Sequence, residues 1–444
     1  MTRRALTLLE LLVAMALSLL LIYGMAAFFV HVSDTIKDGR AIVEMGGDIR
    51  NAVRQLRDDL HSVTAAGRPP LNPSSAAGYF EIIDGTAHDM DVDADGVTDT
   101  NATMQGDTDD ILSFTIRSSG TPFTGWRFDA TNGPQPVTSD LAEVVWFTTF
   151  KDTNGNGTWD AFDEPRFLVR RQLLILPNLT LATAGQPQDF FQDNDVSARF
   201  DSANNRWLAN SLSDLTQREN RFIHLDLDFS DGSQNGLRAA DAIQPAAYMP
   251  NPVQLRVGSP ASLQVYTLQG DKLGEDIVLP NLLAFDARVY DPAAPLYGDD
   301  SADPQAALQP GDPGFVTAYN LNPSNAVGWG AYVDLHYNRT LGSLTLSTPF
   351  AGLPDARSAS GGFASYDTWS TFYERDGLDQ FADGKTDAAF DGLDNAPFAD
   401  GVDDGGEFET SPPYPVKLRG IQVRIRMYEP GTRQTRQATV VSDF

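Results

Sequence analysis

The N-terminal apolar segment constrains this chain more than any other feature. The chain begins with a short leader that contains Arg3 and Arg4, and residues 6–30 then carry a single charged side chain, Glu10. A predominantly apolar stretch of this length can cross a lipid bilayer as one helix. An acidic side chain in such a helix is unfavourable, by roughly 2.5–3.5 kcal/mol for Asp at a helix centre on insertion scales, so we expect Glu10 to have a function. The sequence therefore predicts a transmembrane helix over residues 6–30.

The residues at the start of this segment form a processing motif. The basic leader, residues 1–5, ends in the small residue Ala5, and an apolar-Thr-Leu-Leu-Glu run begins at Leu6. This order resembles the class III signal of type IV pilins and type II secretion pseudopilins, although Ala5 and Leu6 stand where that family usually has Gly and Phe. The resemblance implies that prepilin peptidase cuts between Ala5 and Leu6 and methylates the new amino terminus. It also implies that Glu10, the fifth mature residue, acts in assembly, where its carboxylate could neutralise the amino terminus of a neighbouring subunit.

Two other kinds of N-terminal segment share a basic start and an apolar run. A conventional secretory signal has both, but its apolar region is shorter, rarely contains Glu and ends at a small-x-small cleavage site. A plain single-span anchor is the other alternative. For a chain that stays in the inner membrane, Arg3 and Arg4 predict a cytoplasmic N terminus, because cytoplasmic flanks are enriched in Lys and Arg. Everything after residue 30 would then lie in the periplasm or outside the cell.

The composition argues against several classes of function. The chain of 444 residues contains 60 acidic and 32 basic residues, which gives a net charge of −28. A surface of this charge repels nucleic acids and anionic lipids, so we expect no nucleic-acid partner. The absence of cysteine excludes disulfides, thiol catalysis and cysteine-ligated metal sites. The acidic excess suits a protein outside the cytoplasm that binds divalent cations.

The apolar segment continues into a second, amphipathic half of the same helix, residues 31–66. Apolar residues recur there mainly at spacings of three, four or seven, which is the period of a helix with one buried face. They are Ile36, Val43, Ile49, Val53, Leu56 and Leu60. Gly39, Gly46 and Gly47 interrupt the pattern and could bend the helix, and the Gly-Arg-Pro-Pro sequence that begins at Gly67 ends it.

The remaining residues, 67–444, predict a β-rich globular head with large acidic loop insertions. Segments that alternate apolar and polar residues, or are rich in β-branched and aromatic residues, predict strands. These segments are 110–117, 141–150, 167–175, 222–227, 284–290, 331–335, 418–428 and 437–442. The region 290–315 is rich in Asp, Pro and Ala and predicts a loop. The expected fold class is α+β, with the long helix packed on an antiparallel sheet.

The order of the strands extends the resemblance. The Glu-Val-Val-Trp-Phe sequence in segment 141–150, the loop after it and the Phe-Leu-Val-Arg-Arg sequence in segment 167–175 resemble the head of the minor pseudopilin J and of PilW-type minor pilins. The closing segment 418–428 looks like their final sheet strand. Most of the chain between residues 177 and 411 has no counterpart in this resemblance.

The polar loop between strands 141–150 and 167–175 has the ligand spacing of an EF-hand calcium loop. Counted from Asp152, acidic or amide side chains occupy positions 1, 3, 5, 9 and 12, and Gly157 at position 6 permits a sharp turn. The expected ligands are Asp152, Asn154, Asn156, Thr158, Asp160 and Asp163. The alternative is a polar hairpin loop in which Asp and Asn simply favour turns.

Two further acidic segments are candidate calcium loops. The segment that begins at Asp91 starts with the same pattern, but Ala102 stands where the closing ligand is needed. Later in the chain, Asp-Gly-Leu-Asp and Phe-Ala-Asp-Gly each occur twice within residues 376–404. The expected ligands are Asp91, Asp93, Asp95 and Asp99 in the first segment, and Asp376, Asp379, Asp383, Asp387, Asp391, Asp394, Asp400 and Asp403 in the second. The alternative for both is a solvated acidic loop without an ion.

The sequence contains no recognisable catalytic constellation. There is no His-Glu-x-x-His pair, no Gly-x-Ser-x-Gly elbow, no P-loop and no dinucleotide fingerprint. The expected function is not enzymatic: a minor pilin or pseudopilin, processed by prepilin peptidase and assembled with other such subunits into, or at the tip of, a type IV pilus or type II secretion pseudopilus. A pilus-displayed adhesin or substrate-binding head on the same anchor is the alternative. An anchored hydrolase is a third, because two of the many carboxylates could converge.

Overall fold

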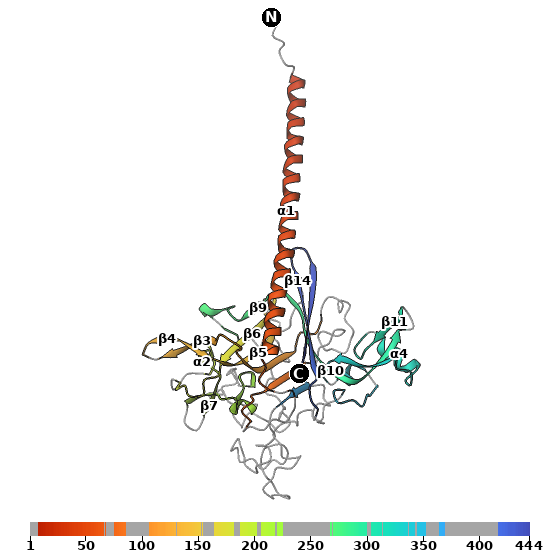
Figure 1. Ribbon diagram of the computed structural model, residues 1–444. Coiled ribbons are helices and arrows are strands. Elements are labelled where there is room, and N and C mark those ends of the chain that lie inside the picture. The colour runs from red at the N-terminus through yellow and green to blue at the C-terminus, as the bar shows by residue number, and fades with distance from the viewer. Residues whose placement is uncertain are drawn as a thin grey trace, which may run out of the picture.

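In the computed structural model, one long helix projects from a β-rich head (Figure 1). The structure describes residues 8–65, 67, 75–85, 106–129, 131–151, 153, 164–181, 187–201, 206–217, 220–224, 267–268, 270–299, 303–312, 314–335, 337–341, 344–351, 364–368 and 416–444. A single helix comes first and antiparallel sheets follow it, which confirms the α+β class that the sequence predicts.

The helix α1 is continuous over Leu8–His61, a length of 54 residues. An α-helix of this length extends for about 80 Å. Gly39, Gly46 and Gly47 all lie inside it, so the glycines that interrupt the apolar pattern do not break the helix. The helix ends before Val63, which forms an isolated β-bridge with Ile116 of the head.

Only the last part of α1 packs closely on the head. Its buried apolar side chains recur every three or four residues, as expected for one face of a helix, and lie against strands β14 (Gly420–Glu429) and β15 (Gln434–Asp443). These side chains are Met45, Ile49, Ala52, Leu56 and Leu60. Ile36 and Val43 remain 66% and 70% exposed, so the buried stripe starts later in the helix than the apolar periodicity predicts.

The first sheet has six strands in the order β13-β1-β2-β5-β6-β9, and all neighbouring pairs are antiparallel. Its strands are β13 (Ala364–Asp367), β1 (Phe80–Asp84), β2 (Ile111–Arg117), β5 (Leu141–Phe150), β6 (Arg166–Leu174) and β9 (Ile277–Leu279). The predicted strands 110–117, 141–150 and 167–175 are confirmed as β2, β5 and β6. The last two pair along their whole length, as a hairpin requires.

The second sheet has five strands. β11 (Asp303–Leu308), β10 (Leu282–Asp299), β14 and β15 follow one another, and β12 (Gly328–Val333) also pairs with β10. The predicted strands 284–290, 331–335, 418–428 and 437–442 are confirmed here, with shifts of a few residues at their ends. β14 and β15 pair from Gly420 and Asp443 to Glu429 and Gln434 in an unbroken antiparallel register.

Two sequence predictions are wrong within the described residues. The region 290–315 is not a loop, because β10 continues to Asp299 and pairs with β11. The Pro-containing stretch of β10 between Asp291 and Pro295 is accommodated by a register shift against β12, the kind of position where a strand tolerates proline.

The predicted strand 222–227 begins instead with a 3₁₀ turn, Phe222–His224. The side chains around this turn bind buried carboxylates of the first sheet, as the next subsection describes.

The remaining described elements are short. Two small hairpins pair β3 (Phe123–Asp129) with β4 (Gly133–Ser139) and β7 (Ala198–Asp201) with β8 (Arg206–Ala209). Two short helices are α2 (Pro187–Asp193) and α4 (Phe315–Leu321), and 3₁₀ turns occur at Asp214–Thr216, Phe222–His224, Gly270–Lys272 and Tyr337–Leu341.

The main hydrophobic core joins α1 to both sheets. Leu56 of α1, Phe114 and Trp146 of the first sheet, and Phe285 and Ile425 of the second sheet all belong to it and are 0% exposed. Side chains that alternate with these along the first sheet point to its opposite face and pack in a second cluster with the residues of α2 and β8. The packed end of α1 is therefore an integral part of the head.

Candidate functional site

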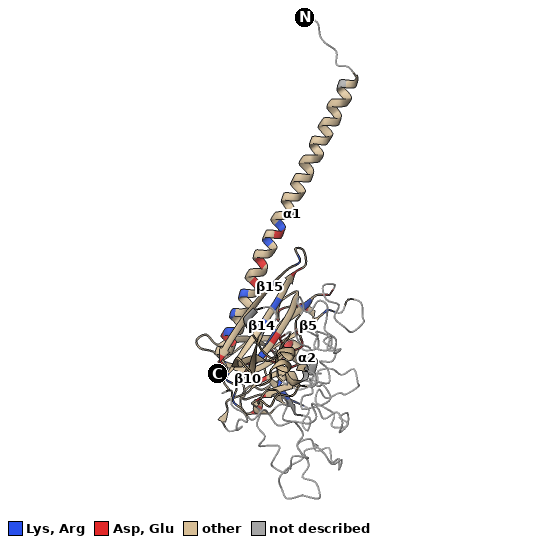
Figure 2. Cartoon of the chain, turned by 90° about the vertical axis from the view of Figure 1, so that its right-hand side faces the viewer, with Lys and Arg blue, Asp and Glu red and all other residues tan. Residues whose placement is uncertain are grey.

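The first half of α1 is apolar and bare. Every large apolar side chain between Leu8 and Val30 is 50–80% exposed. Its most apolar eighteen-residue window has a mean hydropathy of 2.4 and no buried residue, so the helix is long and apolar enough to cross a membrane. Among the described residues of α1, the colours that mark Lys, Arg, Asp and Glu in Figure 2 lie on the part nearer the head. A contiguous apolar surface of this kind marks a site for lipid or for other proteins.

The small and polar residues of the bare half suit an apolar environment. Ala14 and Ser18 lie one helical turn apart, and the Ser18 hydroxyl donates a 2.8 Å hydrogen bond to the Ala14 carbonyl. A hydroxyl that is satisfied within its own helix does not need water. The residues expected in processing, Ala5 and Leu6, lie outside the described residues. Glu10 lies near the start of α1, where the structure describes its backbone as helical.

The other end of α1 is fixed by a buried ion pair that the sequence did not predict. Asp59 accepts two hydrogen bonds from Arg170 of β6, at 2.7 and 2.9 Å, and a third from the indole nitrogen of Trp146 at 2.9 Å. The side chains of Arg170 and Asp59 are only 11% and 7% exposed. Asp59 lies three residues after the buried Leu56 and directly before the buried Leu60. Its place in this helical repeat is the one sequence feature that could have predicted its burial.

The three predicted calcium loops lie almost wholly outside the described residues. These positions are Asp152, Asn154, Asn156, Thr158, Asp160 and Asp163, then Asp91, Asp93, Asp95 and Asp99, and finally Asp376, Asp379, Asp383, Asp387, Asp391, Asp394, Asp400 and Asp403. At the base of the first loop, the Thr153 amide and hydroxyl donate to the Glu164 carboxylate at 2.5 and 2.9 Å. Calcium binding by these loops stays a prediction.

A buried charged network holds residues 220–224 against the first sheet. The Arg221 guanidinium donates to Glu81 at 3.0 Å and to Asp367 at 2.8 Å, and its Cζ lies 4.0 Å from the centre of the Tyr79 ring. Nε2 of His224 lies 2.9 Å from both carboxylate oxygens of Glu81. Burial alone lowers the pKa of Arg221, but Asp367 and Glu81 raise it overall, so the guanidinium stays charged.

Glu143 of β5 completes this network from the neighbouring strands. Its carboxylate accepts hydrogen bonds from the Tyr79 hydroxyl at 2.8 Å, the Ser197 hydroxyl at 2.5 Å and the Phe222 amide at 2.9 Å. Burial raises the pKa of Glu143, and these donors oppose that rise. The side chains of this network are buried, and their hydrogen bonds fix residues 220–224 against the first sheet.

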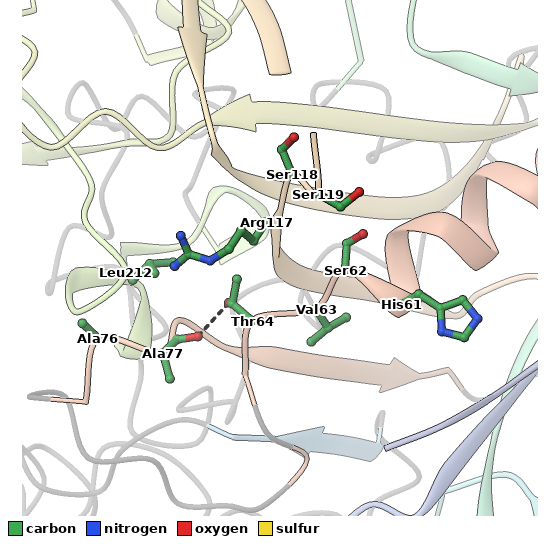
Figure 3. A pocket seen from close by; sticks show the side chains of 10 residues that line it. All are labelled: His61, Ser62, Val63, Thr64, Ala76, Ala77, Arg117, Ser118, Ser119 and Leu212. Atoms are coloured by element: carbon green, nitrogen blue, oxygen red, sulfur yellow. Dashed lines mark hydrogen bonds between the residues drawn. The ribbon is translucent and has the colours of Figure 1, made fainter. Parts of the chain in front are cut away.

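A pocket of about 420 Å³ opens where α1 enters the head (Figure 3). The hydroxyl groups of Ser62, Thr64 and Ser118 each donate to a backbone carbonyl, at 2.7, 2.7 and 2.6 Å. The described lining residues include hydroxyl groups, His61 and Arg117 but no carboxylate. The pocket is lined by His61, Ser62, Val63, Thr64, Ala76, Ala77, Arg117, Ser118, Ser119 and Leu212.

The fold brings together a group of carboxylates that the sequence analysis did not single out. One ligand oxygen from each of Asp107, Asp109 and Asp110 lies within 4.8 Å of the others, just before β2. Asp107 and Asp110 are buried, which is unusual for acidic residues that have no evident partner in the sequence.

No protein-family model, curated protein sequence or solved structure matches this chain. The architecture itself, a long apolar N-terminal helix followed by a β-rich region, is compatible with a pilin-like protein.

Proposed function

We propose that this chain is a minor subunit of a type IV pilus or a type II secretion pseudopilus. Prepilin peptidase would remove residues 1–5, and residues 6–30 would anchor the mature protein in the inner membrane, with the head on the periplasmic side. The observation that carries the proposal is the division of α1. One uninterrupted helix has a bare apolar half and a half that packs on a β-rich head.

The bare half requires a cover that the described part of the head does not provide. Soluble monomers rarely expose contiguous apolar patches larger than a few hundred Å². Lipid would cover the helix before assembly, and the helices of neighbouring subunits would cover it within a filament. The small residues Ala14 and Ser18 would let such helices approach closely.

The bulk of the head favours a rare position in the filament. The described strands and helices of the head spread much wider than α1 (Figure 1). Repetition of this head in every subunit would crowd a filament built from closely packed helices. A position at or near the tip avoids this crowding.

The processing step has a direct test. N-terminal mass spectrometry of the protein from the membrane fraction should find a mature chain that begins at Leu6 with a methylated amino group. Replacing Ala5 by a bulky residue should block the cut, because the peptidase acts after a small residue. A mature chain that begins after residue 30 would contradict the anchor and the function built on it.

The assembly role of Glu10 has a separate test. Glu10→Ala should leave cleavage intact but reduce incorporation into filaments, because the neighbouring amino terminus loses its counter-charge. Glu44→Ala is the matched control, since Glu44 is a carboxylate on the same helix whose side chain is 58% exposed. Normal incorporation of the Glu10→Ala protein would exclude this role.

A receptor function of the head, the alternative, is supported by exposed apolar side chains far from the helix anchor. Leu321, Val327 and Trp329 are 71%, 60% and 66% exposed. Trp329→Ala should abolish binding to a surface or cargo without affecting filament assembly if the head is a receptor. Loss of assembly would instead favour a scaffold role.

A further inference from the structure

The segment 106–110 lies between the two sheets. The Gly106 amide donates to the Leu283 carbonyl at 3.1 Å, and the Phe285 amide donates to the Asp107 carbonyl at 2.8 Å, so the segment runs beside β10. On its other side, the Thr148 hydroxyl of β5 donates to the Thr108 carbonyl at 2.5 Å. Any group bound by this segment would therefore connect the first sheet to the second.

Acidic side chains from three parts of the chain gather around this segment. Asp107, Asp109 and Asp110 supply ligand oxygens within 4.8 Å of one another. The carboxylates of Asp84, at the end of β1, and Asp286, in β10, are close enough to raise the pKa of both Asp107 and Asp110. Burial is the larger cause of both shifts, because it disfavours the charged form.

The nearby guanidinium groups do not balance this charge. The buried Arg166 of β6 faces Asp107 and Asp109, and burial lowers its pKa to about 10 while the two carboxylates oppose that effect. Arg288 is shared between Asp286 and Asp334, at 3.0 Å from each. Arg424 lies 3.7 Å from Asp286. The carboxylates of Asp84, Asp107, Asp109, Asp110 and Asp286 therefore outnumber the guanidinium groups beside them.

Asp107 has a carboxylate oxygen without a hydrogen-bond donor. Oδ1 of Asp107 accepts from the Asp109 amide at 3.3 Å, but its Oδ2 is buried and has no partner, and the residue as a whole is 1% exposed. By contrast, both oxygens of Asp110 are satisfied, by the Gly85 amide at 3.1 Å and the Ala287 amide at 2.6 Å. A buried oxygen without a donor is destabilising, because it has lost its water and gained no partner.

We propose that Asp107, Asp109 and Asp110 form a calcium site at the junction of the two sheets. The ligands are all carboxylate oxygens, which hard divalent cations prefer. Two oxygens bound to one calcium ion lie at most about 5 Å apart, twice the bond length, and the observed spread of 4.8 Å meets that limit. The ion bonds to Oδ2 of Asp107 and offsets the excess charge. It thereby ties segment 106–110 in place between β5 and β10.

Calcium binding by the full-length protein in detergent tests this site. Equilibrium dialysis with radioactive calcium counts the bound ions per chain, and circular dichroism checks the fold. The Asp107→Asn, Asp109→Asn double variant keeps the shape of both side chains but should bind one calcium fewer than the unmodified protein. The matched control is Asp160→Asn, Asp163→Asn in the separate predicted loop, which should still bind at segment 106–110.

A second measurement needs no variant and so does not depend on whether a variant folds. Hydrogen–deuterium exchange of the unmodified protein should slow at the amides of 106–110 in millimolar calcium compared with chelator. The site would be overturned if calcium slowed exchange only in other acidic segments. It would also be overturned if the Asp107→Asn, Asp109→Asn protein bound as many calcium ions as the unmodified protein. In that case protonation, not calcium, neutralises the buried carboxylates.

Discussion

The two halves of α1 share one continuous backbone but have opposite surroundings. Each large apolar side chain from Leu8 to Val30 is at least half exposed, whereas Met45, Ile49 and Leu56 are at most 5% exposed. Residue type does not explain this difference, because leucine and methionine occur in both halves. The difference lies in the cover, since β14 and β15 of the same chain lie against one half only.

The charges of the helix follow the same division. The half nearer the head carries exposed pairs such as Arg40 and Glu44, at 2.7 Å, and Arg54 and Asp58, at 3.8 Å, and it also carries the buried Asp59. Exposed pairs of this kind contribute little to stability, typically about 0–1 kcal/mol. The comparison teaches that buried contacts fix the packed half, while the bare half makes no such contacts with the described part of the head.

The largest effect on this comparison should come from the buried ion pair. Asp59→Ala should lower the free energy of unfolding of the head by about 3–5 kcal/mol, because it leaves the guanidinium of Arg170 buried without its carboxylate. Chemical denaturation of the full chain in detergent, followed by tryptophan fluorescence, measures the change. The control is Asp58→Ala, whose side chain is 69% exposed and whose substitution should change stability by less than about 1 kcal/mol. Equal effects of the two variants would contradict the special role of Asp59.

Matched leucines in the two halves should respond differently to the same substitution. Leu56→Ala creates a cavity at a site that is 0% exposed and should lower the free energy of unfolding by about 2–5 kcal/mol. Leu17→Ala, at a site that is 63% exposed, should leave head stability within about 0.5 kcal/mol of the original. The same denaturation experiment compares them. A large loss from Leu17→Ala would mean that the bare half also supports the head.

A charge in the bare half should affect membrane attachment and not the head. If the proposed anchor is correct, Leu17→Lys should make insertion less favourable by roughly 2.5–3.5 kcal/mol. The protein should then shift from the membrane pellet to the soluble fraction after carbonate extraction, with no change in the melting temperature of the head. Val43→Lys, at a position that is 70% exposed but outside the apolar segment, is the control and should stay in the pellet. Equal retention of both variants would argue against the anchor.

The smallest effect should come from the glycines near the start of the buried stripe of α1. Gly47→Ala should raise stability by about 0.5–1 kcal/mol, because alanine is the better helix former and a side chain there meets open space. Gly46→Ala should gain less, since its Cβ would lie 3.1 Å from the Arg436 guanidinium of β15. Thermal melting of the two proteins measures the difference. A larger gain from Gly46→Ala would show that Arg436 moves aside freely.

The sequence by itself determined the elements whose signals are local. A long apolar run and a three- and four-residue period predict the helix. Alternation or a high content of β-branched and aromatic residues predicts β2, β5, β6, β14 and β15. The processing and assembly motif at Ala5, Leu6 and Glu10 is likewise local. It carries the proposed processing and assembly roles without any help from the fold of the head.

Only the tertiary structure decided which residues meet across the chain. Neighbouring acidic residues on one helix have different environments, since Asp58 faces solvent and Asp59 binds Arg170. Residues 222–224 of the predicted strand 222–227 form a 3₁₀ turn, and the preceding Arg221 binds carboxylates far away in sequence. Asp84, Asp107 and Asp286 gather for the same reason, because the pairing of distant strands places them together. A pattern within one segment carries no information about the charges that another segment brings to it.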